Sequence, residues 1–285
     1  MRCIKIPFEA KKCLISHRVA VAVLKNDYGD GIIMVNGGVF MAEIYAHRGF
    51  TGSFPENTMI AFKEAVKIGA DGIETDVHIT KDGVLCLIHD ETVNRTSNSK
   101  GYIRDMTWEE VKKIDVSCKV LDGRYGFCGI PSAEEFLDLI KTSGIKANIE
   151  LKNGKIYYPK LADKLVDMIR SFGIEDRVMI SSFNNASLVR LKKIAPEIKC
   201  GFLKGSPGVE NAGLYCSEMG VDYYHPDFKT VTPEVKRECD DYGIGLNVWT
   251  VNDKPALRNM MTMGVNSVIT NYPDYAIEVR NEVIK

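Results

Sequence analysis

From residue 43 onward, two hydrophobic periods alternate along the chain. Short apolar runs typical of buried strands are each followed by a stretch with an apolar residue every three or four positions, as in a helix that covers a sheet. Strands that alternate with helices predict a parallel sheet, and eight of them predict a (β/α)8 TIM barrel. The predicted strands cover residues 44–49, 72–80, 146–152, 178–183, 198–203, 223–225, 245–251 and 267–270.

The second predicted strand, GIETDVHIT, carries two carboxylates on one face. Glu74 and Asp76 are two positions apart, so they point to the same side with Cα atoms about 7 Å apart. Neighbouring like charges raise each other's pKa, and a divalent cation between them would relieve the repulsion. A strand with one solvated face explains the same pattern, so this strand alone leaves both interpretations open.

A hairpin is predicted to return from this strand. Asp82 and Gly83 are typical of a two-residue turn, which pairs positions whose numbers sum to 165 and places Asp76 opposite His89. Directly opposed residues share a face of the sheet, so we expect His89 beside the acidic pair. His78 shares that face but lies farther along the hairpin, where we expect it on the solvent side.

The first predicted strand ends in His47 and Arg48, and a helix follows the Pro-Glu-Asn-Thr sequence at 55–58. Asn57 suits the helix N-cap. Because parallel α/β folds build their sites at the carboxyl ends of strands, His47 and Arg48 are candidate site residues. Glu56 and Asn57 either connect this loop to the acidic pair or only cap the helix.

The third predicted strand again places polar residues on its inner face, namely Asn148, Glu150 and Lys152. A buried salt bridge between Glu150 and Lys152 is one explanation, although such pairs rarely add net stability. Beside two other acids, Glu150 is better interpreted as a third ligand of one cation. Lys152 then remains free to face an anion.

The motifs follow one another in a characteristic order. His-Arg-Gly at 47–49 and Pro-Glu-Asn-Thr at 55–58 precede the two acids and His89, and the later motifs are Asn-Arg-Thr at 94–96, Asn-Ile-Glu-Leu-Lys at 148–152 and Asn-Val-Trp-Thr-Val-Asn at 247–252. Each motif is weak alone, but the ordered set is specific. Over about residues 43 to 275 the sequence resembles the glycerophosphodiester phosphodiesterase family.

The resemblance implies a metal-dependent hydrolysis of glycerophosphodiesters to glycerol 3-phosphate and an alcohol. Its mechanism resembles that of bacterial phosphatidylinositol-specific phospholipase C, in which the substrate's own hydroxyl attacks phosphorus and forms a cyclic phosphate. The family pattern implies Glu74, Asp76 and Glu150 as ligands of a divalent metal such as Mg²⁺ or Ca²⁺. It implies His47 as base and His89 as acid, although the sequence itself does not distinguish these two roles. Trp249, inside a family motif, either borders the glycerol pocket or fills the core. The cationic Arg48 and Lys152 are expected to bind the phosphate.

Bulk properties agree with an ordinary soluble globular protein. The chain has 285 residues, a net charge of −1 and 45% hydrophobic residues, which suits one barrel of about 250 residues and argues against a nucleic-acid partner. None of the eight cysteines forms a Cys-x-x-Cys pair, so a zinc or redox motif is not expected. We expect reduced thiols and a cytoplasmic protein.

Two segments stand outside the strand–helix alternation. Residues 1–40 contain a six-residue apolar run, 19–24, which is too short for a membrane span or a signal-peptide core. Residues 19–24 either form a two-stranded hairpin with residues 32–35, or the whole segment 1–40 precedes a true start at Met41. Residues 90–131 are interpreted as an insertion over the barrel mouth.

Two other functions remain in competition, a phospholipase that acts on intact lipids and a barrel that binds phosphodiesters without cutting them. No amphipathic or basic stretch favours the first, and the presence of both histidines and all three acids argues against the second. His225, at a strand end, is a further candidate for substrate contact. The alcohol, the metal and the oligomeric state are left open.

Overall fold

The structure is a computed structural model that describes residues 21–25, 31–35, 38–39, 41–117 and 124–283. The chain divides into two compact units, Met1–Phe40 and Met41–Lys285. In the first unit β1 (Val21–Lys25) pairs antiparallel with β2 (Gly31–Val35), which pairs with β3 (Gly38–Val39). Residues 19–20 and 26–30 of the expected hairpin lie outside the described residues.

The second unit is a closed barrel of parallel strands, which confirms the predicted fold. Each strand pairs with its neighbours in chain order, and β4 closes the ring by pairing with both β5 and β12. The eight barrel strands are β4 (Glu43–His47), β5 (Gly72–Ile79), β7 (Lys146–Leu151), β8 (Val178–Ser182), β9 (Lys199–Lys204), β10 (Tyr223–Pro226), β11 (Gly245–Val248) and β12 (Ser267–Thr270).

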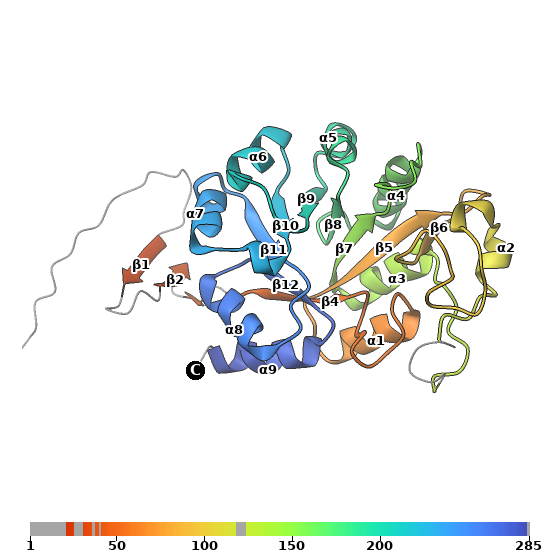
Figure 1. Ribbon diagram of the computed structural model, residues 1–285, viewed down its shortest axis with the longest axis horizontal. Helices are drawn as coiled ribbons and strands as arrows, with labels where there is room; N and C mark the ends of the chain where they lie inside the picture. The colour runs from red at the N-terminus through yellow and green to blue at the C-terminus, as the bar shows by residue number, and fades with distance from the viewer. Residues whose placement is uncertain (1–20, 26–30, 36–37, 40, 118–123, 284–285) are drawn as a thin grey trace, which may run out of the picture. The chain divides into compact units, whose positions relative to one another are not determined.

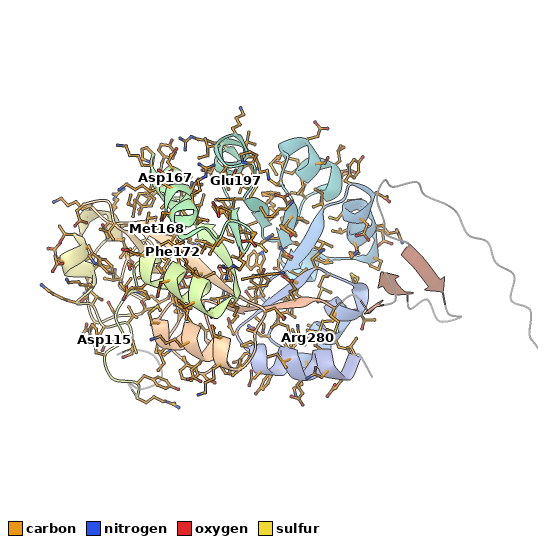
Figure 2. All side chains as sticks on the ribbon, turned by 180° about the vertical axis from the view of Figure 1, so that it is seen from behind. Asp115, Asp167, Met168, Phe172, Glu197 and Arg280 are labelled. Carbon is orange, nitrogen blue, oxygen red and sulfur yellow. The ribbon has the colours of Figure 1, made fainter. Side chains whose placement is uncertain are left out.

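Helices surround these strands (Figure 1), and apolar stripes on them complete the main core. They are α1 (Met59–Lys67), α3 (Ala133–Ser143), α4 (Leu161–Phe172), α5 (Asn185–Ile194), α6 (Ala212–Met219), α7 (Pro233–Asp241), α8 (Lys254–Met263) and α9 (Pro273–Val283). On α4, Met168 and Phe172 pack against the core (Figure 2). Arg280 of α9 (Figure 2) pairs with Asp71, whose carboxylate also accepts from the Ile44 N–H at 2.8 Å.

Local signals explain where the helices begin and end. Ser132 and Glu135 form a reciprocal capping box at the start of α3, and Gly144 ends that helix with a φ of 75°. At α1 the predicted N-cap is wrong by one residue. Thr58 is the cap and its hydroxyl accepts from the Ala61 N–H, because Asn57 turns its side chain toward the barrel instead.

The hairpin forms, but its predicted register is wrong. Strand β6 (Leu85–Leu87) pairs with β5 so that Val77 faces Leu87, and paired positions therefore sum to 164. The turn has three residues, since the Thr80 N–H donates to the Val84 carbonyl and Gly83 has a φ of 89°. A three-residue loop that ends in a left-handed glycine shifts the pairing by one position from a two-residue turn.

The segment after the hairpin builds a second, smaller hydrophobic cluster. It contains the 3-10 turn η1 (Ile103–Asp105) and the short helix α2 (Trp108–Val111), at the right of Figure 1. Apolar side chains of the segment pack on Cys86 and Ile88 at the hairpin. Residues 118–123 of this segment lie outside the described residues.

We expect that a protein lacking residues 1–40 folds and keeps its activity. Every site residue described below lies in the second unit, which carries its own hydrophobic core. Thermal melting and a phosphodiesterase assay of residues 41–285 would check this. Insolubility or a much lower melting temperature would show that the first unit stabilises the barrel.

Candidate active site

A cavity of about 150 Å³ opens at the carboxyl ends of the barrel strands. Its polar lining comes from β4, β5 and β7 and from the chain just after β4 and β6. These residues are His47, Arg48, Glu74, His89, Asn148 and Glu150. The sequence motifs, far apart along the chain, therefore meet at one place. No described residue between 91 and 131 lines this cavity. Arg95 of that segment donates to Asp90 and Glu56, which lie next to lining residues.

Three buried carboxylates form an acidic cluster in this site. One oxygen from each of Glu74, Asp76 and Glu150 lies within 4.8 Å of the others, so that together they could hold a metal ion. Burial and repulsion from Asp76 raise the pKa of Glu74 well above its usual value, and the same causes raise the pKa of Glu150 to about 7. Such shifts are the cost of crowding carboxylates away from water, which a hard divalent cation would relieve.

Two cationic side chains partly offset this cluster. The Lys152 ammonium lies 2.9 Å from a Glu150 oxygen and 3.6 Å from Asp76, and Arg48 Nε lies 3.4 Å from Asp76. Burial opposes ionisation of Asp76, but Arg48 and Lys152 outweigh it and hold the pKa of Asp76 below its usual range. The Arg48 backbone N–H also donates to Glu74 at 3.0 Å.

His47 is held as a neutral imidazole. Its Nδ1 lies 2.6 Å from Asn271 Oδ1, and its Nε2 lies 3.9 Å from Glu74. Burial lowers the pKa of His47 to about 4, and the nearby Arg48 adds to the effect. An amide oxygen can only accept a hydrogen bond, so Nδ1 carries the proton and Nε2 is left with a free lone pair.

His89 has a different partner. Its Nδ1 lies 2.6 Å from Asp90 Oδ1, so a carboxylate holds its ring. Burial nevertheless lowers the pKa of His89 below its usual value. Arg95 donates to Asp90 at 2.7 Å and to both oxygens of Glu56, which accepts from Arg48 as well. A chain of charges thus connects the surroundings of the two histidines.

An apolar wall faces these charged groups. Trp249 and Phe183 meet edge to face with ring centroids 5.8 Å apart, and Leu203 and Ile269 continue the wall. Trp249 therefore borders the cavity, and its Nε1–H donates to the His225 carbonyl at 2.7 Å. A site with one charged side and one apolar side suits a ligand with a phosphate and a carbon chain.

Asn57 connects the first loop to the acidic cluster. Its amide donates to Asp76 at 2.9 Å and accepts from the Thr75 hydroxyl at 2.7 Å. The residue adopts a φ of 52°, in the left-handed region that asparagine tolerates better than most residues. The sequence left two roles open for Asn57, a connection to the acidic pair or the N-cap of α1. In the structure Asn57 makes the connection, and Thr58 is the N-cap.

Two histidines lie differently from what the sequence suggested. His78 is fully buried, so its prediction as a solvent-side residue is wrong; Tyr158, in the loop before α4, packs edge-on against it. His225 is also fully buried and does not line the cavity. Its Nε2 accepts from Asn247 inside the barrel at 3.0 Å.

Several residues of the site were not expected from sequence. Asn271 and Asp90 orient the two histidines, Arg95 pairs with Glu56, and Phe183 lines the cavity. Asp90 could have been found, since it directly follows His89 and an imidazole needs a partner. Asn271 follows β12, and only closure of the barrel brings it to His47.

The burial of His225 leads to a testable pH dependence. Burial lowers its pKa to about 3, whereas the value in an unfolded chain is about 6.5. Below about pH 6.5 the unfolded state binds a proton that the folded state does not, so the free energy of unfolding falls as the pH falls, by about 1.4 kcal/mol per pH unit. We expect His225→Gln to reduce this slope in urea unfolding. Equal slopes in variant and wild type would contradict the assignment.

Comparison with known proteins identifies the family. The model of the glycerophosphoryl diester phosphodiesterase family matches residues 47–275. The chain belongs to this family. It is 42% identical to the glycerophosphodiester phosphodiesterase of Bacillus altitudinis over an alignment of 246 residues, and this alignment covers 85% of this chain and 100% of that protein. The enzyme of the same name from Caldanaerobacter subterraneus subsp. tengcongensis is 41% identical over 236 residues, covering 83% and 96%.

Solved structures of the family share the fold. The crystal structure of a glycerophosphodiester phosphodiesterase from Agrobacterium tumefaciens superposes with a TM-score of 0.74 at 26% identity, covering 84% of this chain and 100% of that chain. The resemblance predicted from the ordered motifs is thus confirmed, and the chain is a phosphodiesterase. Within the described ranges, no helix combines the length and the apolar character needed to cross a membrane.

Proposed function

We propose that this enzyme hydrolyses glycerophosphodiesters to glycerol 3-phosphate and an alcohol, with a divalent cation such as Mg²⁺ or Ca²⁺ held by Glu74, Asp76 and Glu150. The observation that carries the proposal is the placement of two imidazoles at one cavity beside three buried acids. The raised pKa values of Glu74 and Glu150 support a cation at this cluster.

The two histidines have different roles in this proposal. His47 is the base, supported by its bond to Asn271 and its low pKa, which leave a lone pair on Nε2. His89 is the acid, supported by Asp90, whose carboxylate stabilises the protonated ring. The neutral amide beside His47 offers no such stabilisation, and this asymmetry supports the assignment.

The reaction proceeds in two stages. His47 takes the proton of the substrate's 2-hydroxyl as that oxygen bonds to phosphorus, while the bond to the alcohol breaks and His89 donates a proton to the departing oxygen. Water then opens the cyclic phosphate with the proton transfers reversed, giving glycerol 3-phosphate. In the first stage His47 accepts the proton that the substrate releases and His89 donates the proton that the alcohol needs, and in the second stage the two imidazoles exchange these roles, so both return to their starting state.

Fixed positive charge stabilises the phosphoryl oxygens. Arg48 and Lys152 are proposed to bind the phosphate, and Trp249 to pack on the glycerol carbons. The bound cation would supply further charge that offsets the charge developing on those oxygens. Oriented charges at a partly enclosed cavity are more effective than the same groups in open solvent.

The other functions considered have less support. A phospholipase would need an apolar face that enters a membrane, and among the residues that line the cavity Phe183 alone is an exposed large apolar side chain. A non-catalytic barrel would not need two oriented imidazoles. The proposal also places the enzyme in the cytoplasm, supported by five buried, unpaired cysteines at positions 86, 128, 200, 216 and 239. Cys3, Cys13 and Cys118 lie outside the described residues.

Metal dependence can be tested with Glu150→Gln. The substitution keeps the shape of the side chain but removes one negative charge, so we expect about a tenfold to hundredfold weaker metal activation, the range seen when a metal site loses a supporting group. Excess metal should restore part of the activity. The measurement is phosphodiester cleavage by chelated enzyme titrated with Mg²⁺ or Ca²⁺.

Glu134→Gln is the matched control, because Glu134 is an exposed carboxylate on α3 outside this cavity. Its metal titration should match that of the wild type. A Glu150→Gln enzyme with unchanged sensitivity to chelator would remove Glu150 from the ligand set.

A further inference from the structure

His78 is a buried imidazole with both ring nitrogens engaged. Its Nε2 lies 3.3 Å from the backbone carbonyl oxygen of His89, and its Nδ1 lies 3.2 Å from the Tyr158 hydroxyl. The residue is fully buried and does not line the cavity, so it cannot touch substrate. It nevertheless contacts the backbone of the residue proposed to act as the acid.

The two partners determine the tautomer of His78. A carbonyl oxygen has lone pairs and no proton, so Nε2 must be the donor toward His89. Nδ1 then carries a lone pair and accepts from the Tyr158 O–H. The result is a chain of two hydrogen bonds, in which Tyr158 donates to His78 and His78 donates to the His89 carbonyl.

The strand register explains why such a contact is needed. Pairing of Val77 with Leu87 continues to Ile88, whose N–H donates to the Asp76 carbonyl at 3.1 Å. A further step of the same ladder would place His89 opposite Thr75, on the other face of β5 from the acids, because successive residues alternate sides. His89 reaches the cavity because the chain leaves strand geometry after Leu87, and there its carbonyl is held by His78.

We propose that His78 is a positioning residue for the acid of this reaction. Its Nε2–H donates to the His89 carbonyl and thereby fixes the backbone where the chain leaves β6. Tyr158 keeps His78 in the tautomer that can donate this hydrogen bond. The proposal rests on the role of His89 in the function proposed above. It gives the loop before α4, which carries Tyr158, an influence on proton transfer to the leaving alcohol.

The proposal can be tested through the leaving group. A glycerophosphodiester of a simple alkyl alcohol needs a proton on its departing oxygen, whereas a p-nitrophenyl ester of glycerol phosphate does not. The measurement is alcohol or nitrophenol release in a single turnover with enzyme in excess, for wild type, His78→Leu, His78→Gln, Tyr158→Phe and His89→Ala.

We expect His78→Leu to release the alkyl alcohol about 10- to 100-fold more slowly, the scale of a catalytic group displaced by about 1 Å, while nitrophenol release stays close to wild type. His78→Gln should restore most of the rate with the alkyl ester, because glutamine places an N–H donor the same number of bonds from the backbone. Tyr158→Phe should show a smaller loss with the same dependence on the leaving group.

Equal slowing of both esters by His78→Leu, or no slowing of either, would overturn the proposal. If His78→Leu does not fold, Tyr158→Phe decides, since it removes a single oxygen; an alkyl-ester rate equal to wild type would then refute the chain of hydrogen bonds. The His89→Ala enzyme separates the two proposals. If it slows both esters equally, His89 is not the acid and the proposed function fails. If it slows only the alkyl ester while His78→Leu does not, His89 remains the acid and only the positioning role of His78 fails.

Discussion

A substrate whose glycerol moiety lacks the 2-hydroxyl is expected not to be cleaved. His47 lies on one side of the acidic cluster with a free lone pair on Nε2, and His89 lies at the same cavity beside Asp90. One can deprotonate an internal hydroxyl while the other protonates the departing alcohol. A nucleophile positioned within the substrate can supply about 7 to 11 kcal/mol of the barrier, so its removal should have the largest effect of any change considered.

The measurement compares the 2-deoxy analogue with the parent glycerophosphodiester under saturating metal, and follows alcohol release and the transient cyclic phosphate. Competition between the two compounds provides the control, because an analogue that still binds should inhibit cleavage of the parent. Turnover of the analogue at a rate near that of the parent would refute internal attack. Direct attack by water would then remain, with the same residues in altered roles.

Substitution of either histidine is expected to have the next largest effect. His47→Ala and His89→Ala should each lower turnover by about 10² to 10⁴, the contribution of a positioned proton-transfer group. Cleavage by the purified variants would be measured over a range of pH. A change confined to KM would contradict this role for either residue, because a group that moves a proton in the transition state acts on kcat.

These losses should occur without unfolding. His47 and His89 are partly accessible at the cavity, with 17% and 31% of their side-chain surface exposed, so an alanine leaves a space that water can enter. Melting temperatures near that of the wild type are the control. A variant that melts far below the wild type would attribute the loss to stability instead.

Much of the candidate site was predictable because its signals are local. Alternation along β5 and β7 places Glu74, Asp76 and Glu150 on inner faces whatever the exact pairing. The eight alternating strands and helices likewise predict the barrel, because connections between parallel strands leave few topologies. Once the barrel closes, residues at the ends of its strands must meet at one mouth.

His89 illustrates a prediction that reached the right place through wrong geometry. An assumed two-residue turn put it opposite Asp76, but the turn has three residues and the ladder pairs Val77 with Leu87. The side chain arrives at the cavity only because the backbone departs from the strand. Turn length depends on whether Thr80 and Val84 bond across the loop, and the Asp-Gly sequence is compatible with more than one loop length.

The sequence by itself determined the parallel barrel, the three acids on its inner strands and the histidine at the end of β4, because each depends on a period or a spacing within one element. Only the tertiary structure decided which partners hold the two imidazoles and that His78 is buried. Asn271 reaches His47 from 224 residues away, and Tyr158 covers His78 from 80 residues away. Such contacts depend on how separate elements pack, which no local pattern contains.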